Sequence, residues 1–478
     1  MIRFYNTLGR RLEEFRPLKN GEVRMYTCGP TVWNYPHIGN YRTFLFEDLL
    51  RRFLKLSGYR VTQVMNLTDV DDRIIKICRE NDIGLHQFTE KYTSAFFDDL
   101  NFLGIERAEH YPPATEHVPA MVQLIEGLIQ NGLAYRSEDG SVYYSISKFP
   151  SYGKLSGLKV GELKTGARVR QDDYDKDSVQ DFALWKSWDK DDGNIFWETS
   201  LGKGRPGWHI ECSAMAMKYL GEQFDIHTGG VDNIFPHHEN EIAQSEGYTG
   251  KKFVNYWLHS EHLLINDAKM AKRLGNFLTV SDIRDRGISG ETLRFLLLSA
   301  HYRAQLNFTE KSLEQASSSV RRIEEFMLRL DEESQKNQSG ESDSNSRASK
   351  LIEDTRSRYM EALQDDLDTP TALAGVFGFI GEVNRMLDQG HLGKTEVKTM
   401  LDFMNIDFNY VFGAVRRPSV NDSGVSEEIS SLLKERETAR QVKDWRRSDL
   451  LRNKLLEKGI EVQDTPAGQK WRKRSGSA

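Results

Sequence analysis

The 478-residue chain has few cysteines and no long apolar run, and each shortage excludes a class of protein. Three cysteines cannot build a disulfide scaffold, so a reducing cytoplasm is the expected compartment. No window approaches the roughly 18 apolar residues of a membrane span, and residues 1–6 lack the apolar core of a signal peptide. We therefore expect a cytoplasmic protein without a membrane partner.

A strong charge of either sign is also missing. The formal net charge of −6 gives no global nucleic-acid footprint, so any RNA contact must use local basic patches. Hydrophobic residues make up 38% of the chain and charged residues 28%, which fits a soluble protein of several domains.

Residues 23–66 predict a strand, a helix and a second strand. Residues 23–28 alternate as a strand does, residues 42–54 carry apolar side chains at helical spacing, and residues 59–66 predict the next strand. Such a βαβ unit implies a parallel sheet with ligands at the carboxyl ends of its strands. The expected fold class is therefore α/β, with a Rossmann-type catalytic domain.

The rest of the chain changes character twice. Residues 111–200 are rich in Tyr, Trp, Gly and Asp and predict an insertion into the sheet domain. Residues 311–412 predict helices, interrupted by a disordered linker at about 331–350 that contains no large apolar residue. The last 39 residues contain 11 Lys or Arg against 5 Asp or Glu, which predicts a small basic module.

Two thiols, an imidazole and a carboxylate in distant segments make a candidate zinc site, formed by Cys28, Cys212, His237 and Glu241. No CxxC pair exists, so the spacing excludes a zinc finger. On a helix, His237 and Glu241 would share a face because they are four residues apart. Buried thiols and histidines are also common without metal, and Cys78 is most simply a structural thiol.

Two further segments suit phosphate groups. The tetrapeptide HIGN at 37–40 lies at a predicted strand-to-helix turn, where backbone N–H groups favour an anion and Gly39 allows close approach. The segment KMAKRLGN at 269–276 follows a predicted strand and carries three cations within five residues, which suits a triphosphate. Either segment alone is also compatible with an ordinary surface turn.

Together these two segments resemble the HIGH-like and KMSKS-like elements of class I aminoacyl-tRNA synthetases. Further segments resemble the cysteinyl-tRNA synthetase family: YTCGPTV at 26–32, NLTDVDD at 66–72, GWHIECSAM at 207–215, FPHHENE at 235–241, and DTPAG at 464–468 with Trp471. The resemblance covers nearly the whole chain.

The resemblance implies a cysteine–tRNA ligase. Such an enzyme uses ATP with Mg²⁺ to form cysteinyl-adenylate from L-cysteine and transfers the cysteine to the 3′ end of tRNA(Cys). It implies one Zn²⁺ on the four residues named above, with selection of cysteine by zinc–thiolate bonding. We expect a monomer.

The resemblance also assigns the other site residues. It implies that ATP is bound by His37, Gly39, Asn40, Lys269 and Lys272. It also implies that four of these residues are catalytic, namely His37, Asn40, Lys269 and Lys272. It places Thr68, Trp208, His227 and Asp232 in the substrate pocket. Behind the metal ligands, hydrogen-bond donors are expected, for which the candidates are His209, His227 and His238, each also compatible with ordinary packing.

The second phosphate segment departs from the family's pattern, because Ala271 and Arg273 stand where the family has Ser. This departure puts the closing of the loop in doubt more than the activity. Asn40 ends the first segment in place of His, a variant usual in the family.

The expected domains follow from composition and resemblance together. They are the two halves of the catalytic domain at 1–110 and 201–255, a connective insertion at 111–200, the KMSKS-like loop with a stem-contact region at 256–310, a helical anticodon-binding domain at 311–412, and a small basic RNA-binding module at 413–478.

Two other functions stay open at this point. A ligase that passes adenylated cysteine to a sugar amine would share both phosphate segments and the zinc, but it would not need an RNA-binding C-terminal third. A non-catalytic RNA-binding paralogue with structural zinc would not need His37, Lys269 and Lys272. Cysteine-dependent pyrophosphate exchange would discriminate between these functions.

Overall fold

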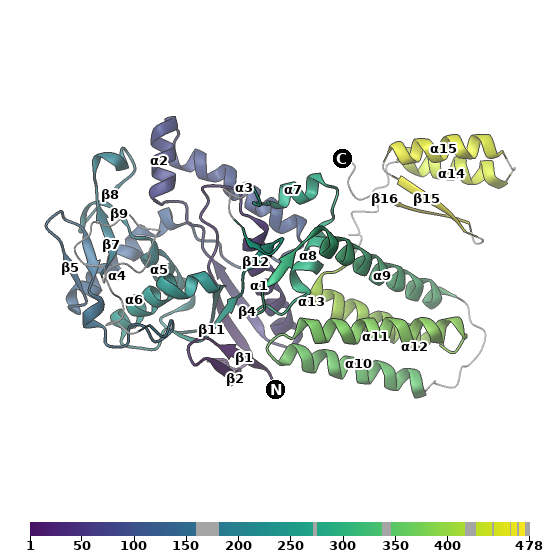
Figure 1. Ribbon diagram of the computed structural model, residues 1–478, viewed down its shortest axis with the longest axis horizontal. Coiled ribbons are helices and arrows are strands. Elements are labelled where there is room, and N and C mark those ends of the chain that lie inside the picture. The colour runs from purple at the N-terminus through teal and green to yellow at the C-terminus, as the bar shows by residue number, and fades with distance from the viewer. Residues whose placement is uncertain are drawn as a thin grey trace.

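The computed structural model describes residues 1–158, 181–270, 275–336, 346–415, 427–441, 444–458, 460–465 and 468–473. Figure 1 shows a central sheet region, with the inserted sheet on one side and a helical bundle on the other. A small α/β module follows the bundle at the C-terminal end.

A four-stranded parallel sheet in the order β11–β10–β3–β4 forms the centre. Its strands are β3 (Glu22–Thr27), β4 (Arg60–Met65), β10 (Phe224–Gly230) and β11 (Val254–Ser260). Helix α1 (Ile38–Leu56) joins β3 to β4, and α6 (Glu239–Thr249) joins β10 to β11. The chain thus runs outward in both directions from β3 and β10, and sheets of this kind bind ligands at that switch point. The expected Rossmann-type fold is confirmed.

Alternate residues of β3 face two separate hydrophobic cores, as the pleat of a strand requires. Met25 belongs to a core that continues through α1 and α8 (Gly290–Leu298) into the helical bundle. Tyr26 belongs to a second core, which is shared with α5 (Trp208–Leu220), α6 and the inserted sheet. The central sheet is therefore covered on both faces, which is the usual condition of a parallel sheet.

The segment between β4 and β10 contains both helices and a second sheet. The helices are α2 (Asp72–Asn81), α3 (Leu85–Phe102), α4 (Val118–Gln130) and α5, which leads into β10. The sheet is antiparallel, in the order β5–β6–β7–β9–β8. Its strands are β5 (Ala134–Arg136), β6 (Val142–Tyr144), β7 (Phe182–Ser187), β8 (Trp197–Thr199) and β9 (Gly202–Pro206).

Short strands and helices connect the central sheet to its surroundings. At the N-terminus, β1 (Arg3–Asn6) and β2 (Arg11–Glu14) form an antiparallel pair. After β11, the strands β12 (Leu263–Ile265), β13 (Ala268–Lys269) and β14 (Leu306–Phe308) form a three-stranded sheet, with α7 (Val280–Asp285) and α8 between β13 and β14. The expected division between residues 255 and 256 lies within β11.

The helical bundle consists of α9 (Glu310–Gln335), α10 (Ser346–Gln364), α11 (Thr369–Asp388), α12 (Lys394–Asp402) and the short α13 (Tyr410–Phe412). The predicted linker at 331–350 is wrong at both ends, because helix covers residues 331–335 and 346–350. At the first end, Glu and Gln favour helix without apolar contacts, and Gln335 donates a hydrogen bond to Asp331 within the last turn of α9. At the second end, Ala348 is fully buried in the core of the bundle. The rest of the predicted linker, residues 337–345, lies outside the described residues.

The C-terminal module pairs two helices with a hairpin. Helices α14 (Glu427–Gln441) and α15 (Trp445–Glu457) pack on strands β15 (Ile460–Thr465) and β16 (Gly468–Lys473). Its small core consists of Leu433, Leu455, Ile460 and Val462.

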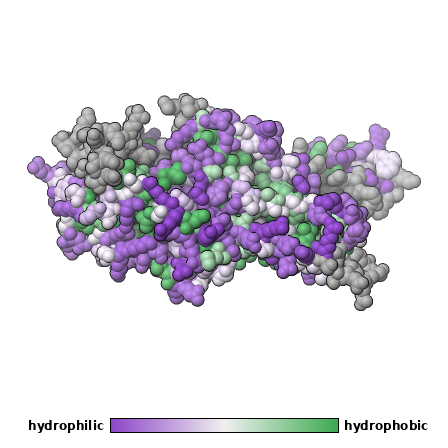
Figure 2. Space-filling view, turned by 60° about the horizontal axis from the view of Figure 1, so that its bottom comes forward, coloured by the Kyte–Doolittle hydropathy of each residue, from purple (hydrophilic) through white to green (hydrophobic). Residues whose placement is uncertain are grey.

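The surface contains no broad apolar region on the face drawn in Figure 2, where small hydrophobic groups are scattered among hydrophilic ones. None of the described helices combines the length and apolar content needed to cross a bilayer.

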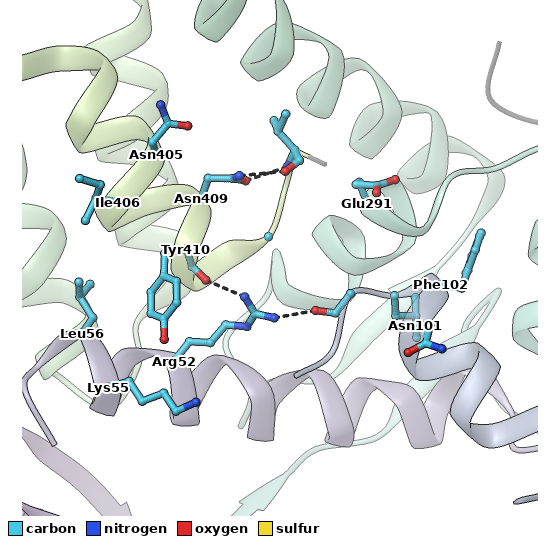
Figure 3. A pocket seen from close by; sticks show the side chains of 14 residues that line it. Arg52, Lys55, Leu56, Asn101, Phe102, Glu291, Asn405, Ile406, Asn409 and Tyr410 are labelled. Carbon is cyan, nitrogen blue, oxygen red and sulfur yellow. Dashed lines mark hydrogen bonds between the residues drawn. The ribbon is translucent and has the colours of Figure 1, made fainter. Parts of the chain in front are cut away.

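A cavity of 660 Å³ marks the junction between the central sheet region and the bundle (Figure 3). Arg52 of α1 spans it, because its Nη1 donates to the carbonyl of Tyr410 at 3.0 Å and its Nη2 to the carbonyl of Gly104 at 2.6 Å. The Nε of Arg52 donates to Asp48 at 2.7 Å, and Asp48 also accepts from Arg294 of α8 at 2.6 Å. The side chains of Asp48 and Arg294 are each 1% exposed, so a buried carboxylate between two guanidinium groups connects three parts of the chain.

Replacing Asp48 by Asn is expected to lower the free energy of unfolding by about 3–5 kcal/mol, because the substitution leaves the buried guanidinium of Arg294 without its carboxylate. Asp365→Asn is the matched control: its pair with Arg3 is about half exposed, and its loss should cost less than ~1 kcal/mol. Urea unfolding of both variants measures the difference. Equal losses would contradict a structural role for the buried pair.

The carboxylate of Asp48 also makes the stability of the fold depend on pH, and its pKa gives the direction of this dependence. Burial raises the pKa of Asp48, but Arg294 and Arg52 outweigh burial, and the pKa lies below its usual value. Asp48 therefore stabilises the fold fully above its unfolded pKa of about 3.9, and this contribution is lost as the pH falls through the folded pKa. The stability difference between the protein and Asp48→Asn should stay constant from about pH 8 to about pH 5 and shrink below about pH 4. A difference that vanished near neutral pH would refute this assignment.

Candidate functional site

A cavity of 450 Å³ opens at the carboxyl ends of the parallel strands, at the switch point between β3 and β10. One part of its wall consists of Cys28, Thr68, Trp208, Cys212 and His237. Another part consists of His37, Gly39, Asn40, Asp232 and Lys269. Folding therefore brings most of the candidate residues from the sequence into one cavity. Lys272 lies outside the described residues.

The four candidate metal ligands come together at this cavity. One ligand atom from each of Cys28, Cys212, His237 and Glu241 lies within 4.8 Å of the others. His237 Nε2 is 3.2 Å from Glu241 Oε1, so the two residues do share a face, although α6 begins only at Glu239. Two sulfurs with one nitrogen and one oxygen fit a zinc ion.

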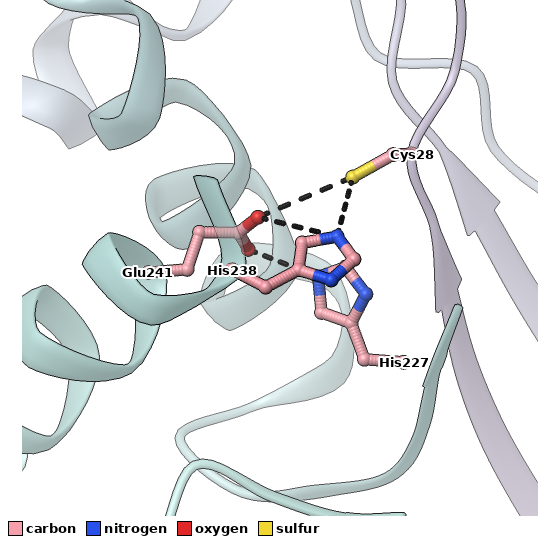
Figure 4. A group of neighbouring side chains, drawn as sticks. All are labelled: Cys28, His227, His238 and Glu241. Atoms are coloured by element: carbon pink, nitrogen blue, oxygen red, sulfur yellow. Dashed lines mark hydrogen bonds and ion pairs between the residues drawn. The ribbon is translucent and has the colours of Figure 1, made fainter. Parts of the chain in front are cut away.

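A second group of possible ligands overlaps the first and is drawn in Figure 4: Cys28, His227, His238 and Glu241. His227 Nε2 is 2.9 Å from Glu241 Oε2, and His238 Nε2 is 3.3 Å from the sulfur of Cys28. Both histidines are fully buried, and neither lines the cavity. A metal on the first group would border the cavity through Cys28, Cys212 and His237, whereas the second group reaches the cavity only through Cys28.

The imidazoles near the cluster have partners for their second nitrogens. His237 Nδ1 is 2.8 Å from Nδ1 of His209, and His238 Nδ1 is 2.8 Å from Nε2 of His259. His259 in turn contacts the hydroxyl of Thr7 at 2.7 Å through its Nδ1. Such bonds fix the orientation and tautomer of a ligating ring. The sequence argument named His209 and His238 but missed His259.

Burial keeps these groups neutral in the absence of a cation. The neighbouring thiol of Cys212 and burial raise the pKa of Cys28. Burial raises the pKa of Glu241 to about 8 and lowers the pKa of His237 to about 3. A divalent cation would reverse this preference for the thiols and the carboxyl group, while His237 is already in the neutral form that ligation needs.

Gly29 allows the chain after β3 to approach the chain after the neighbouring strand β4. A Cβ atom on Gly29 would lie 1.8 Å from the backbone oxygen of Asn66, which follows β4. The backbone N–H of Gly29 donates to the side chain of Asn66 at 2.9 Å. The position of Cys28 therefore depends on the absence of a side chain at the next residue.

The start of α1 forms another part of the cavity wall. His37 is the N-cap, and its Nδ1 accepts from the backbone N–H of Asn40 at 3.1 Å. Burial lowers the pKa of His37, so the ring is neutral, and its remaining proton must lie on Nε2. That N–H, together with the backbone of Gly39 at the cavity wall and the positive end of the helix dipole, suits a phosphate.

The segment after the KMSKS-like element is attached to this helix start. The backbone N–H of Ile38 donates to the carbonyl of Leu278 at 2.9 Å, and the rings of His37 and Phe277 lie edge to face at 5.4 Å. Lys269 and Met270 line the cavity. The departures at residues 271 and 273 lie outside the described residues.

The expected substrate residues lie in different places. The Thr68 hydroxyl donates to Glu211 at 3.1 Å, and the ring of Trp208 lies 4.5 Å from that of His237. Asp232 is exposed at the cavity wall. His227, in contrast, lies behind Glu241, where it can donate to the carboxylate but does not border the cavity.

Several wall residues were missed by the sequence argument. They are Asn66, Arg73, Asn233, Ser260, Glu261 and His262. Asn66 and Ser260 stand at the carboxyl ends of β4 and β11, so the rule for parallel sheets could have identified them. No comparable signal marks Arg73, which projects from α2.

Three known families match successive parts of the chain. Residues 14–318 match the family described as "tRNA synthetases class I (C) catalytic domain". Residues 358–413, within the bundle, match the "DALR domain". Residues 422–472 match the "Cysteinyl-tRNA ligase anticodon binding domain".

Curated relatives match over nearly the full length. The chain is 46% identical to a cysteine–tRNA ligase of Protochlamydia amoebophila over 475 residues, which cover 99% of this chain and 98% of the relative. It is 46% identical to a cysteine–tRNA ligase of Brachyspira hyodysenteriae over 477 residues, which cover 99% of each.

Solved structures share the fold at low sequence identity. The methionyl-tRNA synthetase of Mycobacterium tuberculosis bound by methionyl-adenylate has a TM-score of 0.62 at 11% identity, with 84% of this chain and 97% of that chain covered. A leucyl-tRNA synthetase of Agrobacterium radiobacter in a ternary complex has a TM-score of 0.60 at 11% identity, with 84% of this chain and 85% of that chain covered.

Gly29→Ala is expected to weaken metal binding although it changes no ligand, because the new methyl group forces Cys28 and Asn66 apart. The strain should also cost about 1–3 kcal/mol of stability. Gly84→Ala is the control, since nothing lies within 4 Å of a Cβ atom at that position. Competition with a chelator measures the metal affinity, and equal affinities in the two variants would refute the steric argument.

Proposed function

Because the chain belongs to the cysteine–tRNA ligase family of class I aminoacyl-tRNA synthetases, we propose that a zinc ion on Cys28, Cys212, His237 and Glu241 selects its amino acid. The family's reaction is the joining of L-cysteine to tRNA at the expense of ATP. Zinc-based selection, the ligand set and the roles of single residues form the proposal.

The observation that carries the proposal is the position of the four residues at the cavity. Three of them line the cavity wall, so a metal there has an open side toward a small ligand. Bound zinc supplies a soft Lewis acid that favours a thiolate over a hydroxyl group, which is the difference between cysteine and serine. Pocket shape alone separates such isosteres by only roughly 10–200-fold.

The surrounding residues orient this site. His209 fixes the ring of His237 through its second nitrogen, and His227 can donate to Glu241. Trp208 forms an apolar wall beside His237, and Thr68 lines the cavity. We assign Trp208 and Thr68 to the amino-acid pocket and the buried histidines to holding the ligands in place.

The activation step needs orientation and charge stabilisation rather than a protein nucleophile. The carboxylate of cysteine attacks the α-phosphorus of ATP, the bond to the β-phosphate oxygen breaks, and magnesium pyrophosphate leaves. His37 and the α1 N-terminus donate to phosphate oxygens, and Gly39 and Asn40 belong to the same helix start. Lys269 and Lys272 neutralise the departing pyrophosphate.

In the transfer step, a hydroxyl group of the terminal tRNA ribose attacks the acyl carbon and AMP leaves. Asp232, exposed at the cavity wall, is positioned to accept a hydrogen bond from a ribose or an amino group. We assign tRNA contacts to three regions: the stem-contact region at 256–310, the helical bundle at 311–412 and the basic module at 413–478. We further propose that the enzyme is a monomer, which light scattering on the purified protein tests.

The deciding experiment is the transfer of labelled cysteine to total tRNA by the purified protein with ATP and Mg²⁺. Transfer of cysteine without transfer of serine in a parallel reaction supports both the activity and the selection. Cysteine-dependent pyrophosphate exchange without transfer would instead favour a ligase with a small-molecule acceptor. Equal transfer of serine would contradict zinc-based selection while leaving the ligase activity in place.

The two overlapping ligand groups predict opposite mutational outcomes. Cys212→Ser is expected to abolish stoichiometric zinc, because it removes a sulfur that only the first group uses. His227→Gln should retain one zinc per chain with an affinity weakened about 10–100-fold, as expected for a residue that orients a ligand. Elemental analysis and chelator competition measure both quantities. The reverse pattern would assign the metal to the group that contains His227 and His238.

His37→Ala and Lys272→Ala are expected to slow cysteinyl-adenylate formation about 10²–10³-fold with little change in cysteine affinity, because each removes a donor to the phosphates. Single-turnover adenylation measures the rate, and equilibrium binding measures the affinity. Lys76→Ala, an exposed substitution on α2, is the control. A normal adenylation rate in either variant would remove that residue from the proposal.

A further inference from the structure

The loop between the metal ligand Cys28 and the helix cap His37 carries aromatic side chains toward two helices. The guanidinium of Arg73, on α2, lies over the ring of Trp33, 4.9 Å from its centroid. Tyr35 packs edge to face on Tyr92 of α3, with ring centroids 5.2 Å apart.

A second cation accompanies the second aromatic pair. The Nζ of Lys91 lies 5.7 Å from the ring centroid of Tyr35 and 5.3 Å from that of Tyr92. We call Trp33, Tyr35, Arg73, Lys91 and Tyr92 the aromatic–cation strip.

Part of the strip lies at the surface, whereas Trp33 and Tyr92 are half-buried and Tyr92 also packs against the core. Tyr35 is 40% exposed, the side chain of Arg73 is 52% exposed, and Lys91 is exposed as well. Arg73 pairs with Asp71 at 3.2 Å, whereas Lys91 forms no ion pair within the described part of the chain. Rings that reach the surface beside exposed cations suit a ligand with flat faces and negative charge.

Arg73 brings one end of the strip to the cavity. Arg73 is part of the cavity wall. Its helix α2 is attached to the inserted sheet, because Asp72 pairs with Lys186 at 2.8 Å and also with Arg205. In Figure 1, α2 and α3 lie along the upper edge of the molecule, between the inserted sheet and α7.

We propose that the aromatic–cation strip is a stacking platform for the unpaired 3′-terminal nucleotides of tRNA. The inference rests on the proposed function, in which the terminal ribose must reach the cavity. Single-stranded nucleotides bind proteins by stacking on aromatic rings, while cations contact their phosphates. Trp33 and Tyr35 offer the rings, and Arg73, at the cavity wall, and Lys91 offer the charges.

The test compares two tRNA transcripts, one complete and one without its unpaired 3′-terminal nucleotides. Trp33→Ala is expected to weaken binding of the complete tRNA about 5–150-fold, the range typical for loss of one stacked base. Binding of the shortened tRNA should not change, because the bases that stack on the ring are absent. Trp33→Phe keeps an aromatic face and should bind the complete tRNA within about threefold of the unmodified protein.

Substitution of Lys91 provides a second, independent test. Lys91→Ala should weaken binding of the complete tRNA and reduce the salt dependence of that binding, whereas Lys91→Arg should restore both. Lys76→Ala on α2 is the matched control, since this lysine is also exposed but lies outside the strip. Cysteine-dependent pyrophosphate exchange, which needs no tRNA, should keep its rate and its KM for ATP in all strip variants.

The possible outcomes distinguish a failure of the stacking platform from a failure of the proposed function. An equal loss of affinity for both tRNAs would overturn the platform, as would unchanged affinity for the complete tRNA. A raised KM for ATP with unchanged tRNA binding would also overturn it and would place the strip at the nucleotide substrate. Failure of the unmodified protein to catalyse cysteine-dependent exchange would refute the proposed function instead, while the binding comparison would still test the strip.

Discussion

The parallel pairing of β3 with β10 is the contact on which the candidate site depends. Met25, Tyr26 and Thr27 lie opposite Ile226, His227 and Thr228, and the backbone N–H of Cys28 reaches the carbonyl of Thr228 at 3.4 Å. This pairing sets Cys28 beside the strand that leads into α6, and so beside Glu241. A slip of one residue would turn the strand's side chains to the other face and separate the two halves of the cluster.

The same arrangement also determines the protonation states of the groups at the bottom of the cavity. Two thiols, a carboxyl group and several imidazoles are buried together, and burial favours the neutral form of each. Such a cluster gains little from mutual attraction, whereas one divalent cation can stabilise the thiolates and the carboxylate together. The chemistry that suits selection of a thiol is therefore also the chemistry that satisfies this buried cluster.

The domains around the sheet are coupled through α1. Its first turn faces the cavity, its middle packs into the core that continues to the bundle, and its last turns carry Asp48 and Arg52 to the junction with α8 and α13. One helix thus connects the phosphate-binding cap with the helical region. A displacement of the bundle would act on His37 through a rigid element rather than through a flexible loop.

The sequence by itself determined the α/β class, the candidate ligands and both phosphate segments, because these depend on residue type, spacing and family resemblance. Residue type and spacing do not rank His237 and Cys212 above His227 and His238. The family resemblance supplied that ranking, and the packed structure adds that only His237 and Cys212 of these four reach the cavity. The sequence also could not find His259, Arg73 or the aromatic–cation strip, whose members come from separate elements. Tertiary structure decided these points because distances between distant segments depend on strand register and helix packing, which no local pattern encodes.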